Sequence, residues 1–312
     1  MDRYTPRQSR FDSRGGAGRQ PRVRRVRAVV LTTCAAALAV ALAAGIYSSA
    51  EARSAARSTP TAPATAPPAA QASARASAAS IDATLDAQLD AIIAANSQYQ
   101  IGVALVDLSQ GAGSAEAHEY GIQEKFVAAS TAKVLAAAAY YHLVETGVAS
   151  LDAPLGNYTA GFQLREMVQQ SDNDSWSLIM DAVGHEELTE YAATLGVSYD
   201  PEVNTLTPAE MATIVSRLYS GSLLNPADTA QLLSYMQDTN YETLIPAAVP
   251  DGITVFHKYG LLGDELHDAA VLARDDTAYA LVIYTKGQDL SDDPERTEVI
   301  HQLTQAVTGA LF

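Results

Sequence analysis

Cysteine and lysine are the scarcest chemically active residues in this chain of 312 residues. The single cysteine, Cys34, excludes an internal disulfide framework and any metal site built from several thiolates. We interpret Cys34 as a packing residue because it lies inside an apolar stretch. Only four lysines stand against sixteen arginines, so a lysine inside a recognisable motif is more informative than usual. They are Lys125, Lys133, Lys258 and Lys286.

Charged residues are absent from 28–47, and twenty residues at about 1.5 Å each can cross a bilayer core of roughly 30 Å. Residues 1–27 carry nine arginines and two acids, so they bury no core and stay on the cytoplasmic side. We therefore expect 1–27 to be a basic cytoplasmic tail. We expect 28–47 to be either a retained single-pass anchor or the apolar part of a cleaved signal peptide. The rest of the chain would then be held outside the cell membrane or be secreted.

Nucleic acid is not an expected partner, because the arginines adjoin an apolar span and have no interleaved aromatic residues. Residues 48–80 are rich in Ala, Pro, Ser and Thr, which predicts an extended linker. The remainder, 81–312, has eight basic and thirty-three acidic residues, so its formal charge is 8 − 33 = −25. That charge argues against nucleic acid or an anionic membrane surface as a partner of this part.

Hydrophobic spacing divides 81–312 into elements. An amphipathic helix is predicted over 82–96, a strand over 100–108 and a second strand around His118 and Tyr120. A helical block follows from 131 to about 223, then three strands at 253–257, 266–273 and 278–285, and a closing helix at 294–311. This order predicts an α+β fold. Its five-stranded antiparallel sheet would be flanked by the N- and C-terminal helices, with an all-helical subdomain inserted after the second strand.

Three short motifs carry the chemistry. Ser130 and Lys133 are three residues apart at the expected start of a helix, where a lysine amine can approach a serine oxygen and take its proton. Ser171-Asp172-Asn173 precedes another helix, and His257-Lys258-Tyr259-Gly260 ends a predicted strand. Each motif alone is more often an ordinary helix cap or strand end.

In this order, the three motifs resemble the Ser-x-x-Lys, Ser-Asp-Asn and Lys-Thr-Gly set of class A β-lactamases and penicillin-binding proteins. The similarity extends to Phe126, to Thr207 through Ala212 and to Leu281 through Thr285, and it covers nearly all of 81–312. It implies a β-lactamase-like or transpeptidase-like fold. The activity implied is that of an acyl-serine hydrolase acting on β-lactams or D-alanyl cell-wall peptides.

The resemblance also implies roles for individual residues. Ser130 would form the acyl-enzyme, Lys133 would activate it, Ser171 would relay a proton to the leaving nitrogen, and Lys258 would supply positive potential. Asp200, in Asp200-Pro-Glu-Val-Asn, is the nearest match to the glutamate that positions the deacylating water in class A enzymes.

Substrate binding is implied for a second group of residues. Asn173 would hold the substrate amide, and the backbone N–H groups of Ser130 and Leu261 would stabilise the oxyanion. Tyr259 and Gly260 occupy the Thr-Gly positions of the third motif. Neither a cofactor nor a metal is expected, because His257 and His267 come without a third recognisable ligand motif.

The chain departs from the family pattern in two places. The Asp200 loop is shortened, and aspartate is one methylene shorter than glutamate, so the resemblance leaves efficient β-lactam turnover open. Tyr259 replaces a small hydroxyl residue, and no arginine lies between Gly260 and Arg274 to help bind a substrate carboxylate. Two alternatives follow: a wall-binding or β-lactam-sensing module without turnover, and an esterase or amidase on the same scaffold.

Overall fold

The computed structural model describes residues 81–109 and 116–312. The predicted cytoplasmic tail, apolar segment and linker at 1–27, 28–47 and 48–80 lie outside these residues, so their expected roles stay predictions. Among the helices of the described residues, none combines the length and the apolar character needed to cross a bilayer.

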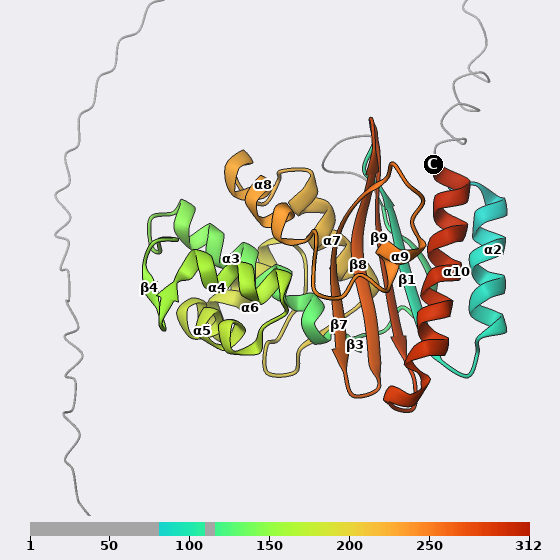
Figure 1. The fold of residues 1–312 in the computed structure, drawn as a ribbon, viewed down its shortest axis with the longest axis horizontal. Coiled ribbons are helices and arrows are strands. Elements are labelled where there is room, and N and C mark those ends of the chain that lie inside the picture. Colours follow the sequence, from blue (N-terminus) through green and yellow to red (C-terminus); the bar gives the residue numbers. More distant parts are fainter. Residues whose placement is uncertain (1–80, 110–115) are drawn as a thin grey trace, which may run out of the picture. The chain divides into compact units, whose positions relative to one another are not determined.

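One five-stranded antiparallel sheet forms the centre of the fold, with strand order β2-β1-β9-β8-β7 (Figure 1). The first two strands in the chain lie together at one edge, and the last three complete the sheet. Their bounds are β1 Gln100–Asp107, β2 His118–Gly121, β7 Thr254–Leu262, β8 Glu265–Arg274 and β9 Thr277–Lys286. β7, which carries the third motif, is therefore an edge strand.

The terminal helices cover one face of this sheet (Figure 1). Helix α2 (Ala83–Ala95) starts where the Asp82 side chain accepts a hydrogen bond from the backbone N–H of Thr84. Helix α10 (Asp293–Leu311) packs beside α2 and against the short α9 (Ile245–Ala248). Leu85, Leu89 and Leu303 are fully buried between these helices and the sheet. This layer of helices packs on the face of the sheet opposite α7 (Pro208–Tyr219) (Figure 1).

The opposite face carries α7 (Pro208–Tyr219), which packs on β1, β8 and β9, and the other helices lie beyond it (Figure 1). A capping box between Thr207 and Glu210, with Pro208 in the first turn, fixes where α7 begins. The other helices are α3 Lys133–Glu145, α4 Ala160–Gln169, α5 Asn173–Val183, α6 His185–Thr194 and α8 Pro226–Tyr235. Two-stranded pairs join β3 (Phe126–Val127) to β6 (Thr205–Leu206) and β4 (Pro154–Leu155) to β5 (Tyr158–Thr159).

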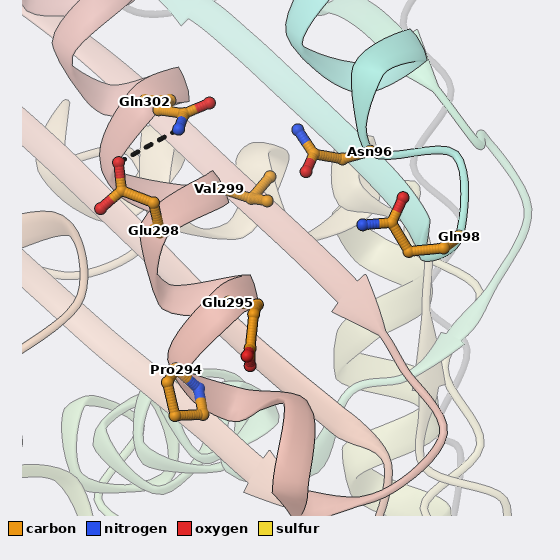
Figure 2. A pocket seen from close by; sticks show the side chains of 7 residues that line it. All are labelled: Asn96, Gln98, Pro294, Glu295, Glu298, Val299 and Gln302. Atoms are coloured by element: carbon orange, nitrogen blue, oxygen red, sulfur yellow. Dashed lines mark hydrogen bonds between the residues drawn. The ribbon is translucent and has the colours of Figure 1, made fainter.

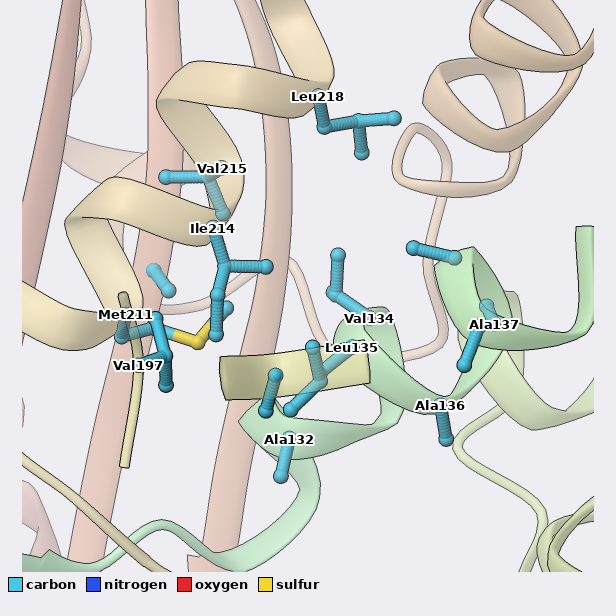
Figure 3. Close-up of a cluster of buried hydrophobic side chains, with 14 of the residues drawn as sticks. Ala132, Val134, Leu135, Ala136, Ala137, Val197, Met211, Ile214, Val215 and Leu218 are labelled. Carbon is cyan, nitrogen blue, oxygen red and sulfur yellow. The ribbon is translucent and has the colours of Figure 1, made fainter. Parts of the chain in front are cut away.

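The alanine-rich first half of α3 lies in the core of the molecule. Figure 3 shows Val134 and Leu135 facing side chains of α7 such as Ile214. Val134, Leu135 and Ala137 are all fully buried. Small alanine side chains let the neighbouring helices approach α3 closely, and this central packing holds the residues at its N-terminus rigidly.

The predicted α+β fold is confirmed, with the helical region inserted between the second and third strands of the sheet. Three local expectations were wrong. Ser130 lies in a 3-10 turn, Ala129–Ala132, and the α-helix begins only at Lys133. Lys258 lies in the middle of β7 rather than at a strand end. Helices α8 and α9 were not expected.

Candidate active site

The turn that carries Ser130 is held by the Thr131 hydroxyl, which contacts both the chain directly before the turn and strand β9. Thr131 donates its hydroxyl proton to the carbonyl oxygen of Ala128 at 2.6 Å, and its oxygen lies 2.6 Å from the Tyr284 hydroxyl of β9. Ala129, directly before Ser130, has a φ of 49°, a conformation that costs energy for a residue with a Cβ. Ser130 itself is partly exposed. Ser130 is thus held, partly exposed, on a turn that cannot shift easily.

His267 holds the same turn from β8. Its Nδ1 accepts the backbone N–H of Thr285 at 3.1 Å, so its Nε2 carries the proton and donates it to the carbonyl oxygen of Val127 at 2.9 Å. Burial lowers the pKa of His267 to about 4, and the ring stacks on Tyr284 at 4.1 Å. We conclude that His267 is a neutral structural residue that fixes the approach to Ser130.

Lys133 lies one turn after Ser130, and its ammonium group has three acceptors from the second motif. Its Nζ donates to the carbonyl oxygen of Ser171 at 2.6 Å, to the Ser171 hydroxyl at 3.3 Å and to Asn173 Oδ1 at 2.7 Å. Only 3 % of Lys133 is exposed. Burial lowers the pKa of Lys133 to about 8, against a smaller opposing effect of the Asp172 carboxylate. A neutral amine is therefore within reach near physiological pH.

The second motif is held in a strained conformation. Ser171 has a φ of 55°. Asp172 caps α5 by accepting the backbone N–H of Ser175 at 2.7 Å, and its own backbone N–H donates to the carbonyl of Glu166. The hydrogen bonds on both sides hold Ser171 so that its carbonyl and its hydroxyl both face Lys133. Lys133 is thus hydrogen-bonded to Ser171 and Asn173 across two helix starts, and Ser130 lies in the turn directly before Lys133.

Lys258 is buried at the edge of the sheet, beneath the aromatic ring of its neighbour. Its Nζ lies 3.9 Å from the centre of the Tyr259 ring and donates to the carbonyl oxygen of Tyr259 at 3.0 Å. Lys258 has no exposed surface. Burial, and next to it the charge of Lys133, hold the pKa of Lys258 well below its usual range, so the two lysines are electrostatic neighbours. The first and third motifs therefore meet, as expected.

Gly260 brings the backbone of β7 against the Ser130 turn. A Cβ at Gly260 would lie 3.1 Å from the carbonyl oxygen of Ala128 and 3.2 Å from the Cβ of Ala129, tighter than nine in ten real Cβ contacts. Any larger residue would push the Ser130 turn away from β7 by a few tenths of an ångström. Leu261 follows and is 36 % exposed, so the segment predicted to supply an oxyanion donor runs beside the turn that carries the nucleophile.

A connecting segment that the sequence did not single out joins the second and third motifs. The Asn240 side-chain amide donates to the carbonyl oxygen of Gln170 at 2.9 Å, and its Oδ1 accepts the Tyr259 hydroxyl at 2.9 Å. Gln170 directly precedes Ser171. Asn240 thus sets the distance between the strand of Lys258 and the loop of Ser171. An isolated asparagine between α8 and α9 carries no pattern that would have revealed this.

His257 anchors the same segment from the other side. Its Nδ1 lies 2.9 Å from Asp268 Oδ1, and its Nε2 lies 3.0 Å from the Thr239 hydroxyl and 3.1 Å from Glu242 Oε1. Burial alone would lower the pKa of His257, but the Asp268 and Glu242 carboxylates outweigh it and raise the pKa to about 9. His257 is thus a buried imidazolium between two acids. It points to the opposite face of the sheet from His267, as the strand register requires.

The Asp200 loop is built differently from the rest of the site. Asp200 is exposed, and its carboxylate accepts the backbone N–H of Glu202 at 2.8 Å, within its own turn. Asn204 makes the link to the nucleophile turn: its amide donates to the carbonyl oxygen of Ala129 at 3.2 Å, and its own carbonyl oxygen accepts the backbone N–H of Ala128 at 2.8 Å. Asn204 ends the Asp200-Pro-Glu-Val-Asn motif, but the sequence pointed to a role only for Asp200. The contacts of Asn204 with the turn are visible only in the structure.

A separate cavity of about 410 Å³ lies behind the sheet, where the end of α2 meets α10 (Figure 2). Asn96, Gln98, Glu295 and Gln302 are among its lining residues. They share no residue with the three motifs, so we do not assign the cavity to the reaction. Within 81–109 and 116–312, no group of three or more His, Cys, Asp or Glu side chains is arranged to hold a metal ion.

Together, the fold and the site define a serine-centred hydrolase site with two buried lysines. A model of the β-lactamase enzyme family matches residues 84–311, so the chain belongs to that family. It is 27 % identical to the β-lactamase OXY-2 of Klebsiella oxytoca over 250 residues, 68 % of this chain and 84 % of that protein. It is also 27 % identical to a β-lactamase of Proteus vulgaris over 251 residues, 68 % and 90 % of the two chains.

Solved structures agree with this assignment. A mutant of PBP-A, solved as an acyl-enzyme complex with penicillin G, matches with a TM-score of 0.64 and 25 % identity over 73 % of this chain and 96 % of that one. An ancestral class A β-lactamase has the same fold, with a TM-score of 0.65 and 24 % identity over 72 % of this chain and all of that one. The predicted resemblance is confirmed, and the protein is an acyl-serine hydrolase of the β-lactamase type. The roles of the individual residues stay predictions.

Proposed function

We propose that this protein is acylated at Ser130 by β-lactams or by D-alanyl cell-wall peptides and that it releases the acyl group slowly. The observation that carries the proposal is the buried Lys133, whose three hydrogen bonds reach the second motif while its pKa falls to about 8. An amine with this pKa can accept the Ser130 proton near neutral pH, which an ordinary lysine cannot.

These contacts, and the position of Ser130 three residues before Lys133, support the following first half-reaction. The neutral Lys133 amine takes the Ser130 proton as the serine oxygen bonds to the acyl carbon. The negative charge that develops on the acyl oxygen is stabilised by the backbone N–H groups of Ser130 and Leu261. The carbon–nitrogen bond then breaks, and the proton passes from Lys133 through the Ser171 hydroxyl, 3.3 Å away, to the leaving nitrogen. Asn173 binds the substrate amide and orients the acyl group.

The second half-reaction has less support in the site. Hydrolysis of the acyl-enzyme needs a base beside a water molecule, and the exposed Asp200 carboxylate is engaged by its own turn. Asn204, hydrogen-bonded to the Ala129 carbonyl, is the polar side chain of this loop nearest to the nucleophile turn. We therefore propose that the acyl-enzyme persists for longer than in an efficient β-lactamase.

Intact mass spectrometry of the full-length protein with penicillin G tests this proposal. We expect an adduct of the penicillin mass on the wild type, none on Ser130→Ala, and decay over minutes or longer. An adduct that disappears within seconds while hydrolysed penicillin accumulates would contradict slow release. An equal adduct on Ser130→Ala would contradict the choice of nucleophile.

A second candidate activity is the hydrolysis of simple esters or amides. It is favoured by the covered Lys258, whose ammonium lies under the Tyr259 ring and has no exposed surface. Turnover of p-nitrophenyl esters that is lost in Ser130→Ala, without a penicillin adduct, would favour this candidate over the first. Saturable penicillin binding that survives Ser130→Ala would favour a sensing module instead.

We further propose that the domain is held outside the cytoplasm by 28–47, either as an anchor or after signal cleavage. The charge-free length of 28–47 after nine arginines supports this proposal. Expression of the full chain with a C-terminal epitope, followed by protease treatment of intact cells, would test it. An epitope that resists protease until the cells are lysed would contradict the proposed location.

A further inference from the structure

Tyr259 changes what Lys258 can offer to a substrate. The lysine is completely buried; its Nζ donates to the Tyr259 carbonyl at 3.0 Å and faces the Tyr259 ring at 3.9 Å. The ring is fixed in turn, because its hydroxyl donates to Asn240 Oδ1 at 2.9 Å and it packs on Tyr241 with ring centres 4.9 Å apart. The Lys258 ammonium group therefore has no exposed surface for a carboxylate to contact, and a ring held by its hydroxyl and by Tyr241 covers one side of it.

The charges around Lys133 and Lys258 also make the site unfavourable for an anionic substrate. The Asp172 carboxylate lies close enough to raise the pKa of Lys133, and Asp268 does the same for Lys258, so each lysine has a partly neutralising acid nearby. Burial still lowers both pKa values, so each lysine loses its positive charge at a lower pH than an ordinary lysine does. The whole of 81–312 has a formal charge of −25, which repels an anion on approach.

We propose that Tyr259 makes this site selective for acyl donors whose leaving part has no carboxylate, such as an uncharged ester, thioester or amide. This inference rests on the proposed acylation of Ser130 and ranks its donors: penicillins and D-alanyl peptides, whose leaving parts carry a carboxylate, should acylate Ser130 more slowly than uncharged donors do. The preference acts through an unfavourable element, a ring placed over the Lys258 ammonium group, rather than through a better contact with the neutral donor.

The reaction itself is ordinary acyl transfer. The Ser130 oxygen bonds to the acyl carbon, the bond from that carbon to the leaving sulfur, oxygen or nitrogen breaks, and the serine proton ends on the leaving group by way of Lys133. No oxidant, reductant or second substrate is needed before water releases the acyl group. The charge of the leaving part is therefore the only variable between two matched donors.

The test uses one acyl group on two leaving groups, acetyl-D-alanyl thioglycolate and its methyl ester, with full-length protein. Acylation of Ser130 is followed by mass spectrometry, and each rate is divided by the rate of hydroxide hydrolysis of the same thioester. We expect the methyl ester to react about tenfold faster with the wild type than the carboxylate does. Added salt should speed the anionic donor and leave the neutral donor unchanged, because salt screens the repulsion.

Two variants isolate the ring. Tyr259→Thr removes the cover, so the preference should fall below about twofold or reverse. Tyr259→Phe keeps the ring but loses the hydrogen bond to Asn240, so most of the preference should remain. Thermal unfolding of both variants checks that they fold, and Tyr259→Phe still tests the inference if Tyr259→Thr does not fold.

Equal corrected rates in the wild type, or an unchanged preference in folded Tyr259→Thr, would overturn the inference. No adduct from either donor would overturn the proposed function, and the inference with it.

Discussion

The loop of Ser171 contacts Lys133, directly after the Ser130 turn, and the loop of Asp200 contacts that turn through Asn204, yet the Ser171 and Asp200 side chains are held very differently. Ser171 and Asn173 share a buried amine, and Asn240 ties the residue before Ser171 to the sheet. Asp200 is exposed and satisfied within its own turn. The side of the site that would form the acyl-enzyme is fixed by several hydrogen bonds from separate elements.

This difference shows that one fold can support the two half-reactions, acylation of Ser130 and hydrolysis of the acyl-enzyme, to different degrees. Acylation needs a base and a proton donor, and the Lys133 cluster contains both: an amine of lowered pKa and the Ser171 hydroxyl 3.3 Å from it. Activation of a water molecule needs a carboxylate lone pair directed at that water, beside the acyl carbon. The Asp200 carboxylate already uses one of its oxygens for a backbone N–H.

The largest expected effect concerns Lys133, the residue on which the contrast between the two loops depends most. Lys133→Met should lower the rate of acylation by penicillin roughly 10²- to 10⁴-fold, because it removes the base while filling the same volume. Stopped-time mass spectrometry measures the adduct. Lys125→Met is the matched control, since Lys125 pairs at the surface with Glu210 at 3.6 Å, and it should change the rate less than threefold. Equal losses in both variants would remove Lys133 from its proposed role.

The pH dependence of acylation also tests whether Lys133 is the base. With the pKa of Lys133 near 8, roughly one molecule in ten has the neutral amine at pH 7 and about nine in ten at pH 9. The acylation rate should therefore rise almost tenfold across this interval and then level off. Asp172→Asn removes a charge that raises this pKa but keeps an oxygen to cap α5, so the midpoint should move to lower pH. An unchanged midpoint would contradict this assignment.

Asn240→Ala tests whether the bridge between the motifs matters for the reaction. We expect a loss of about fivefold in acylation rate, because the Gln170 carbonyl before Ser171 and the Tyr259 hydroxyl both lose their partner. The effect of Tyr259→Phe should be largely absent in the Asn240→Ala background, since the two changes remove the same hydrogen bond. Asn96→Ala is the control, as Asn96 only caps the end of α2 through the Ile92 carbonyl. Fully additive effects would contradict the bridge.

The sequence predicted the α+β fold because the strand and helix periods are clear and the motifs occur in a recognisable order. Ser130 is close to Lys133 along the chain because only two residues separate them, whereas the hydrogen bonds from Lys133 to Ser171 and Asn173 follow from no spacing in the sequence. The sequence could not predict the cover over Lys258. That contact depends on a tyrosine side chain folding over the edge of β7 and on Asn240, which is distant in the chain. Contacts of this kind have no periodic signature.

The smallest expected effect concerns Asp200. Asp200→Ala should change the lifetime of the penicillin adduct less than twofold, because the carboxylate is exposed and bonded within its turn. Asn204→Ala should alter it more, since Asn204 contacts the carbonyl oxygen of Ala129 directly before the nucleophile. Adduct decay in the two variants, measured side by side after removal of free penicillin, decides between them. If Asp200→Ala lengthened the adduct lifetime tenfold, the loop would have to rearrange on acylation. The contrast between the two sides of the site would then hold only before the substrate reacts.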